Sequence, residues 1–262
     1  MFWHRFPHNK CCLCGESERL TGEHKIKASA LRDEFGSESL CVGTMNAPAE
    51  KMRLAQSPNS KHLKFQIPIC EKCNTSRTQQ ADREFDLFHQ LAKEKVSCRD
   101  NPSNIFNNER YKENSDPYLN VFRYFAKLLS CHLATSEAPI PISLAQFAIS
   151  RNTTNCIDLE VKKDPTYHHI NEQIGIHQYA AHGGLVVYGN RNTKEPSAFH
   201  STLTVGALQY VFSMRLNELE VIELRERFPD FYDWCRSIIE HTIQNPMSES
   251  LQLRLGIREQ NA

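Results

Sequence analysis

The chain has 262 residues, of which 40% are hydrophobic and 24% are charged, and its 31 basic residues balance 31 acidic ones. This composition excludes an intrinsically disordered chain, and no stretch has the roughly 18 consecutive apolar residues that a membrane span requires. The length accommodates two domains of ordinary size.

Charge is unevenly distributed along the chain. Up to Arg99 there are 16 Lys and Arg against 12 Asp and Glu, whereas the remainder has 15 against 19. A mildly basic N-terminal part is compatible with a nucleic-acid partner. Since the first residues lack the apolar region of a secretory signal, we expect a cytoplasmic protein without a membrane partner. In that reducing compartment the ten cysteines are expected to be metal ligands or buried thiols.

The first predicted unit covers residues 1–96. A short strand is predicted over Leu20–Ile26, followed by a polar loop. A second strand is predicted over Lys61–Ile69, where apolar residues alternate, and a helix is predicted to begin at Cys70. The expected order is therefore strand, loop, strand, helix.

Residues 97–116 are polar and are predicted to be a linker or surface connection, and residues 117–262 are predicted to form a second unit. Helical spacing predicts a strong helix over Pro117–Ala134, and we interpret its Lys127 as a lysine whose ammonium reaches solvent past apolar neighbours. The further predicted elements are helices Leu144–Ile149 and Phe231–Thr242 and strands Cys156–Val161, Gly184–Tyr188 and Phe199–Met214, the last bent near Gly206. The predicted fold class is α+β, and this second unit has an antiparallel sheet.

Two CxxC pairs lie in the first unit. Cys11 and Cys14 form one pair, and Cys70 and Cys73 form the other. Two intervening residues let a tight turn direct both thiolates at one ion, and four thiolates make a closed tetrahedral zinc site of the structural kind. Unrelated buried thiols or a redox pair are the alternatives, and the identical spacing of the pairs favours zinc. Cys12 is a poorer ligand candidate because it lies inside the first pair.

Glu23 and His24 lie between the two pairs, directly after Gly22. A CxxC pair, then an acidic residue followed by His, then CxxCN at the start of a helix resembles the HNH endonucleases of the ββα-metal class. The resemblance covers about residues 8–95 and implies a zinc-stapled ββα-metal (HNH) module ahead of the α+β unit.

The resemblance also implies roles for individual residues. His24 takes the position of the general base, and Glu23 that of the acidic ligand of a catalytic divalent ion, Mg²⁺ or Mn²⁺. Asn74 takes the position of the last residue of the motif and completes that ion site. Arg77 takes a position that is usually basic and would contact a phosphate of the nucleic acid. The chemistry is coherent, because such an ion stabilises transition-state charge while a neutral imidazole accepts a proton from water.

Two features depart from the family pattern. No Asn stands near Phe65, where the middle Asn is expected; Asn59 or His62 are alternatives, and the role stays unassigned. The proline that commonly follows the His-containing strand is also missing, with Lys27 and Ala28 nearby instead.

The expected function is therefore a metal-dependent endonuclease that hydrolyses phosphodiester bonds of nucleic acid, for which we expect double-stranded DNA. The resemblance to HNH proteins also suggests a setting in prokaryotic defence or mobile elements. Residues 117–262 would grip the substrate, sense a protein partner or form a homodimer. The alternative is a non-catalytic zinc module that binds nucleic acid or a protein.

Overall fold

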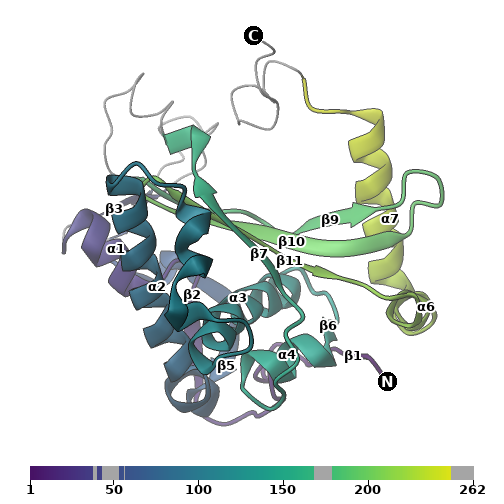
Figure 1. The fold of residues 1–262 in the computed structure, drawn as a ribbon. Coiled ribbons are helices and arrows are strands. Elements are labelled where there is room, and N and C mark those ends of the chain that lie inside the picture. Colours follow the sequence, from purple (N-terminus) through teal and green to yellow (C-terminus); the bar gives the residue numbers. More distant parts are fainter. Residues whose placement is uncertain (38–39, 43–52, 56, 168–178, 249–262) are drawn as a thin grey trace.

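The computed structural model describes residues 1–37, 40–42, 53–55, 57–167 and 179–248. Helices and antiparallel sheets are mixed in this part of the chain, which confirms the α+β class. Figure 1 shows a sheet that crosses the molecule. Helices α2 and α3 lie on one side of this sheet, and α7 lies beside β9 and β10. Among the described helices, none combines the length and apolar character needed to cross a membrane.

The N-terminal part contains two antiparallel strands followed by a helix, in the predicted order. Strand β2 (Leu20–His24) pairs with β5 (Lys64–Cys70), and the register is irregular between Gly22 and His24. Alternate residues of β5 are buried, as the sequence pattern predicted. Helical turns begin directly after Cys70, first as the π-helix η3 (Cys73–Arg77) and then as α2 (Gln79–Ser97).

Shorter elements surround this pair of strands. The described ones are β1 (Trp3–His4), α1 (Ala28–Phe35), β3 (Leu40–Val42), β4 (Arg53–Ala55) and the 3-10 helix η2 (Lys61–Leu63). β1 pairs with β6 (Ile140–Pro141), so the first residues of the chain lie against its second half. β3 pairs with β4.

The polar segment after α2 is packed rather than extended. It forms the 3-10 helices η4 (Pro102–Asn107) and η5 (Glu109–Tyr111), and Ile105 and Tyr111 are buried. Arg110 donates two hydrogen bonds, 2.7 and 2.8 Å long, to the carboxylate of Glu84 on α2. The segment then enters α3 (Asp116–Thr135), and α4 (Ile142–Ala148) follows β6.

The second half contains a five-stranded antiparallel sheet. Its strands are β7 (Asp158–Lys163), β8 (Ala180–His182), β9 (Val186–Gly189), β10 (Pro196–Val205) and β11 (Leu208–Arg215), in the order β7-β11-β10-β8, with β9 also paired to β10. The single bent strand predicted over Phe199–Met214 is wrong. Two strands form a hairpin there, and Gly206 adopts a positive φ of 57° in the turn.

Two helices complete the chain, α6 (Glu218–Arg227) and α7 (Pro229–Gln244). The sequence predicted α7 but not α6, whose apolar residues form no continuous stripe. α7 packs on β9 and β10.

One hydrophobic core contains residues from both halves of the described chain. Phe85 of α2 stacks on Tyr124 of α3 with ring centroids 4.0 Å apart. On the other side of α3, the ring of Phe125 lies 5.1 Å from that of Phe212 in β11. Phe85 also lies 5.6 Å from the ring of Tyr210 in β11, so α2 and α3 both pack against the large sheet.

Candidate functional site

The four predicted cysteines lie together. One sulfur from each of Cys11, Cys14, Cys70 and Cys73 falls within 4.8 Å of the others, and among the described residues this is the cluster that could hold a metal ion. The Cys14 and Cys70 sulfurs are 3.6 Å apart and the Cys73 and Cys14 sulfurs 3.5 Å apart. Four sulfurs at these separations suit Zn²⁺, whose bonds to thiolate sulfur are about 2.3 Å long. The cluster could therefore hold a zinc ion.

Local backbone structure explains why these cysteines converge. The N–H of Gly15 donates to the carbonyl of Cys11 over 2.8 Å, and a positive φ of 78° at Gly15 closes the first turn. The N–H of Cys73 donates to the sulfur of Cys70 over 3.4 Å. Pairing of Leu20 with Cys70 then brings the second turn beside the first. Hydrogen bonding with Cys73 is the main reason that the pKa of the Cys11 thiol falls to about 5.

Asn74 and Arg77 both contact this cysteine end of the strand pair. The amide nitrogen of Asn74 donates to the hydroxyl oxygen of Thr21 over 3.0 Å. A guanidinium nitrogen of Arg77 donates to the sulfur of Cys73 over 3.3 Å. The structure thus gives both side chains partners within the protein, at or beside the cysteine cluster.

Glu23 lies at the opposite end of β2 and is 7% exposed. Its carboxylate pairs with the ammonium of Lys127 over 2.9 Å, and that ammonium also pairs with Asp82 over 2.6 Å. Asn74 contacts Thr21, two residues before Glu23, which is roughly 7 Å along a strand. Among the described residues, no hydrogen bond joins Glu23 and Asn74, and each side chain has a different partner.

Lys127 was interpreted from the sequence as a lysine reaching solvent, and this is wrong. Its side chain is 1% exposed and lies with its ammonium 5.5 Å from the ring centre of Tyr124. Burial by itself lowers the pKa of Lys127, but Asp82 and Glu23 outweigh burial and raise it above its usual value. The buried ammonium is charged because two carboxylates compensate for its lost hydration.

A second lysine extends this group, which we call the buried ionic cluster and define as Glu23, Asp82, Lys127, Lys27 and Asp86. Its Asp86 side chain lies at the surface and is 38% exposed. Lys27, just before α1, pairs with Asp86 over 2.6 Å and also donates to the backbone carbonyl of Asp82. The sequence did not predict that Asp82 and Lys127 lie together beside Glu23. One signal was available for Lys127, a lysine within an otherwise apolar run of a predicted helix.

His24 lies beside the buried ionic cluster, opposite Lys64 in the β2–β5 register. Its Nε2 atom is buried and has no hydrogen-bond partner among the residues that the structure describes. Burial, followed by the charges of Lys64 and Lys127, lowers the pKa of the imidazole to about 4. His24 is therefore neutral at pH 7. Arg32 adds to the positive charge around it, and Asp82 acts in the opposite direction. Asn59 and His62, the alternatives for the middle Asn, are both exposed.

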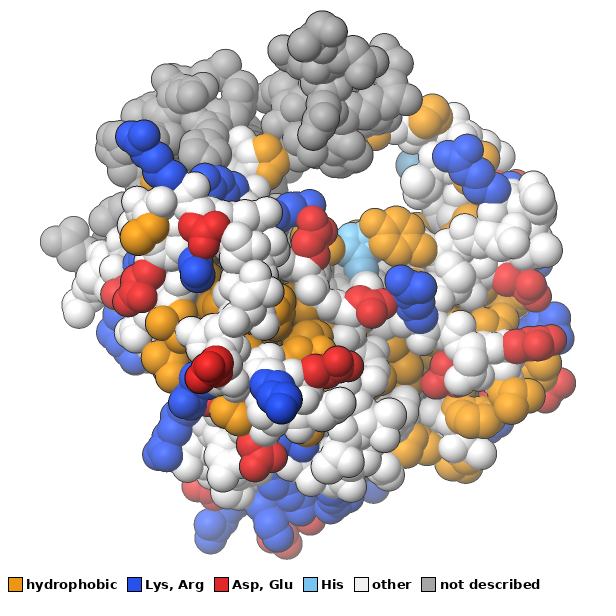
Figure 2. All heavy atoms as spheres, in the orientation of Figure 1, with side chains coloured by type: hydrophobic (Ala, Val, Ile, Leu, Met, Phe, Trp, Pro, Cys, Tyr) orange, Lys and Arg blue, Asp and Glu red, His pale blue; other side chains and the backbone are white. Residues whose placement is uncertain are grey.

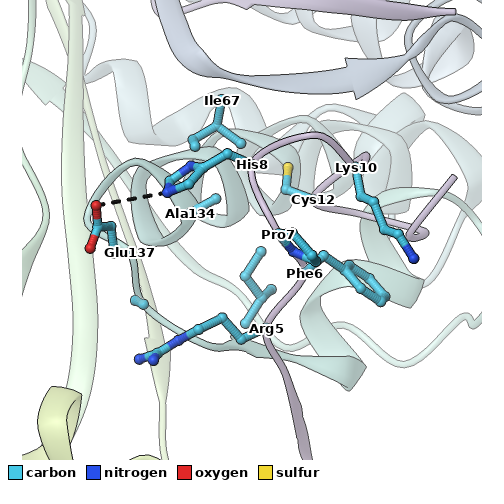
Figure 3. Close-up of a pocket in the computed structure, with 11 residues that line it drawn as sticks. Arg5, Phe6, Pro7, His8, Lys10, Cys12, Ile67, Ala134 and Glu137 are labelled. Atoms are coloured by element: carbon cyan, nitrogen blue, oxygen red, sulfur yellow. Dashed lines mark ion pairs between the residues drawn. The ribbon is translucent and has the colours of Figure 1, made fainter. Parts of the chain in front are cut away.

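A separate pocket of about 370 Å³ lies between the first residues of the chain and the end of α3. Figure 3 shows Arg5 and Lys10 pointing in different directions, while His8 pairs with Glu137 over 3.7 Å. Arg5 is itself paired with Asp230 over 2.9 Å. Because its charged groups do not converge, and Arg5 and His8 are paired with carboxylates, this pocket is a weaker candidate than the surroundings of His24.

Comparison with known protein families, curated proteins and solved structures finds no match to this chain.

Proposed function

We propose that the chain is a nuclease that hydrolyses phosphodiester bonds of nucleic acid, with His24 as the general base and a structural zinc at the four cysteines. The observation that carries the proposal is the unpartnered, buried Nε2 of His24 in an antiparallel strand pair that leads into a helix. An unsatisfied buried acceptor costs about 1–3 kcal/mol, which a substrate or water bound there would recover. The resemblance to HNH endonucleases points to the same residue.

The charges around His24 favour an anionic substrate. Lys64 faces His24 across the strand pair, and Arg32 acts on the imidazole from α1. Both cations are suited to phosphate oxygens. Figure 2 shows several Lys and Arg side chains along the lower edge of the molecule with Asp and Glu side chains among them, and both signs are mixed over the rest of that face.

The reaction requires one proton acceptor. The oxygen of a water molecule forms a bond to phosphorus, the bond from phosphorus to the leaving nucleoside oxygen breaks, and the proton of the water passes to His24. The leaving oxygen takes a proton from solvent. The imidazole is neutral before the step, and the negative charge of a bound phosphodiester raises its pKa toward the working pH.

The test is cleavage of double-stranded DNA, with single-stranded DNA and RNA alongside. His24→Ala should reduce cleavage at least 100-fold, because general-base catalysis typically contributes that much or more. His62→Ala is the matched control, since His62 is exposed and lies two residues from Lys64. If His24→Ala cleaves as fast as the parent with unchanged zinc content, the assignment of His24 as the general base is wrong.

A second candidate function is a non-catalytic zinc module that binds nucleic acid. It is favoured by the partners of Glu23, Asn74 and Arg77, all of which are satisfied within the protein. It predicts that DNA is bound equally well by the parent and by His24→Ala, and that neither cleaves it with any divalent ion.

A further inference from the structure

The cation beside Glu23 is the ammonium of Lys127, a buried side chain of the protein. Lys127 comes from α3, and its side chain is 1% exposed while that of Glu23 is 9% exposed. Its two carboxylate contacts, 2.9 Å to Glu23 and 2.6 Å to Asp82, have the length of charge-assisted hydrogen bonds. The aromatic stack of α2 on α3 fixes the helix that carries it.

A divalent ion does not fit beside this ammonium. Mg²⁺ binds oxygen at about 2.0–2.1 Å and keeps several waters, so it needs both a free carboxylate oxygen and open volume. Glu23 offers little open volume because it is 7% exposed, and its Oε1 atom is already paired with Lys127. The amide of Asn74, the second expected ligand, is bonded to Thr21 instead.

Charge leads to the same conclusion. The buried ionic cluster contains three carboxylates, from Glu23, Asp82 and Asp86, and two ammonium groups, from Lys27 and Lys127. Its net charge is −1 with both lysines charged. A divalent ion added without loss of a lysine would lie next to Lys127 and be repelled.

From this geometry we infer that the ammonium of Lys127 occupies the position that a catalytic divalent ion would take at Glu23. The cations around His24 are then side chains of the protein and not a bound metal ion. The role of Glu23 as a carboxylate next to the base rests on the proposed nuclease function, but occupation of its position by Lys127 does not. Lys127 is a positioning residue, because it touches Glu23 and Asp82 and acts on His24 through its charge.

The direct test is titration of the zinc-loaded protein with Mn²⁺, which broadens NMR signals of nearby protons. The His24 ring signals of the parent should stay sharp up to millimolar Mn²⁺. Lys127→Met frees two carboxylates and should bind Mn²⁺ at least tenfold more tightly, with broadening at His24. Lys127→Arg keeps the charge and should behave as the parent.

Lys93→Met is the matched control. Lys93 also bridges two carboxylates, Asp33 at 2.6 Å and Glu34 at 3.9 Å, but its side chain is 40% exposed. Its replacement should leave the His24 signals unchanged on addition of Mn²⁺. If Lys127→Met does not fold, the parent titration still decides, because broadening of the His24 signals of the parent below millimolar Mn²⁺ overturns the inference.

Cleavage assays separate the two proposals. If His24 is the general base, the zinc-loaded parent should cleave in buffer stripped of Mg²⁺ and Mn²⁺. Lys127→Arg should then retain most of this activity, and Lys127→Met should lose it. Cleavage that needs Mg²⁺ together with Mn²⁺ broadening at His24 would keep the nuclease and overturn the role of Lys127. No cleavage under any condition, with sharp His24 signals, would overturn the nuclease and support the assignment of Lys127.

Discussion

Single side chains of the β2–β5 strand pair have sharply different surroundings. Glu23 and His24 are adjacent, yet the carboxylate is paired in the buried ionic cluster while the imidazole Nε2 has no partner among the described residues. The register of the strand pair is irregular between Gly22 and His24, and at this irregularity two adjacent side chains have different surroundings. Of the two residues, His24 is the one to which the proposed base role belongs, whereas Glu23 is paired with Lys127.

Asp82→Asn tests the buried ionic cluster by removing charge at nearly constant shape. Lys127 then keeps only Glu23, and we expect a loss of about 3 kcal/mol in the free energy of unfolding, measured in urea, because a buried ion pair is broken. Asp33→Asn is the control, since the Asp33 side chain is 51% exposed and its pair with Lys93 should be worth under about 1 kcal/mol. Equal losses in the two variants would show that burial of the cluster contributes nothing.

His132 gives the folding stability a defined dependence on pH. It is 6% exposed, and burial, with smaller effects of His182 and Lys25, lowers its pKa from 6.5 to about 3. The unfolded chain therefore binds the proton first, so stability contributed by neutral His132 is lost as pH falls below about 6.5. We expect the free energy of unfolding to fall by about 2 kcal/mol between pH 6.5 and 5. In urea unfolding at several pH values, His132→Gln should remove this part of the dependence of the unfolding free energy on pH. An unchanged slope in the variant would contradict the assignment.

At the scale of elements, the cysteine cluster joins the turn before β2 to the turn after β5. Cys11 and Cys14 lie on one side, and Cys70 and Cys73 on the other. A zinc ion at this place would fix the ends of both strands, and Asn74 adds a hydrogen bond from η3 to β2. Such an ion would also help to hold the register that positions His24 at the far end of β2.

Zinc content checks this arrangement. The purified parent should contain one zinc per chain, and Cys70→Ser should lower that content and reduce thermal stability strongly, since a structural zinc supplies roughly 10 kcal/mol or more of apparent binding energy. Cys98→Ser is the control, because Cys98 is exposed and lies outside the cluster. One equivalent of zinc retained in Cys70→Ser would contradict the four-cysteine site.

At the scale of the whole molecule, α3 connects the strand pair to the large sheet. It carries Tyr124 against Phe85 of α2, Phe125 against Phe212 of β11, and Lys127 into the buried ionic cluster. The described part of residues 117–262 therefore contributes directly to the surroundings of His24, in addition to any role in binding a partner.

Phe85→Ala tests the shared core. Phe85 is fully buried, and its truncation should cost about 3–5 kcal/mol of unfolding free energy. Because both halves share the core, the urea transitions followed by circular dichroism and by tryptophan fluorescence should coincide and shift together. Phe2→Ala, at a residue 37% exposed, should shift neither by more than about 0.5 kcal/mol. Separation of the two transitions would show two independent cores.

Local pattern determined the cysteine cluster, the two strands around it and the helices α2, α3 and α7. The reason is that CxxC spacing, alternation and helical periodicity act over a few residues, and the chain displays them directly. The sequence predicted one bent strand where the structure has the hairpin of β10 and β11, because both arms of this hairpin have strand-like sequences on either side of Gly206. Only the tertiary structure decided which cation lies beside Glu23. Lys127 reaches it through packing of α3 on α2, a contact between residues far apart in the chain that no local pattern encodes.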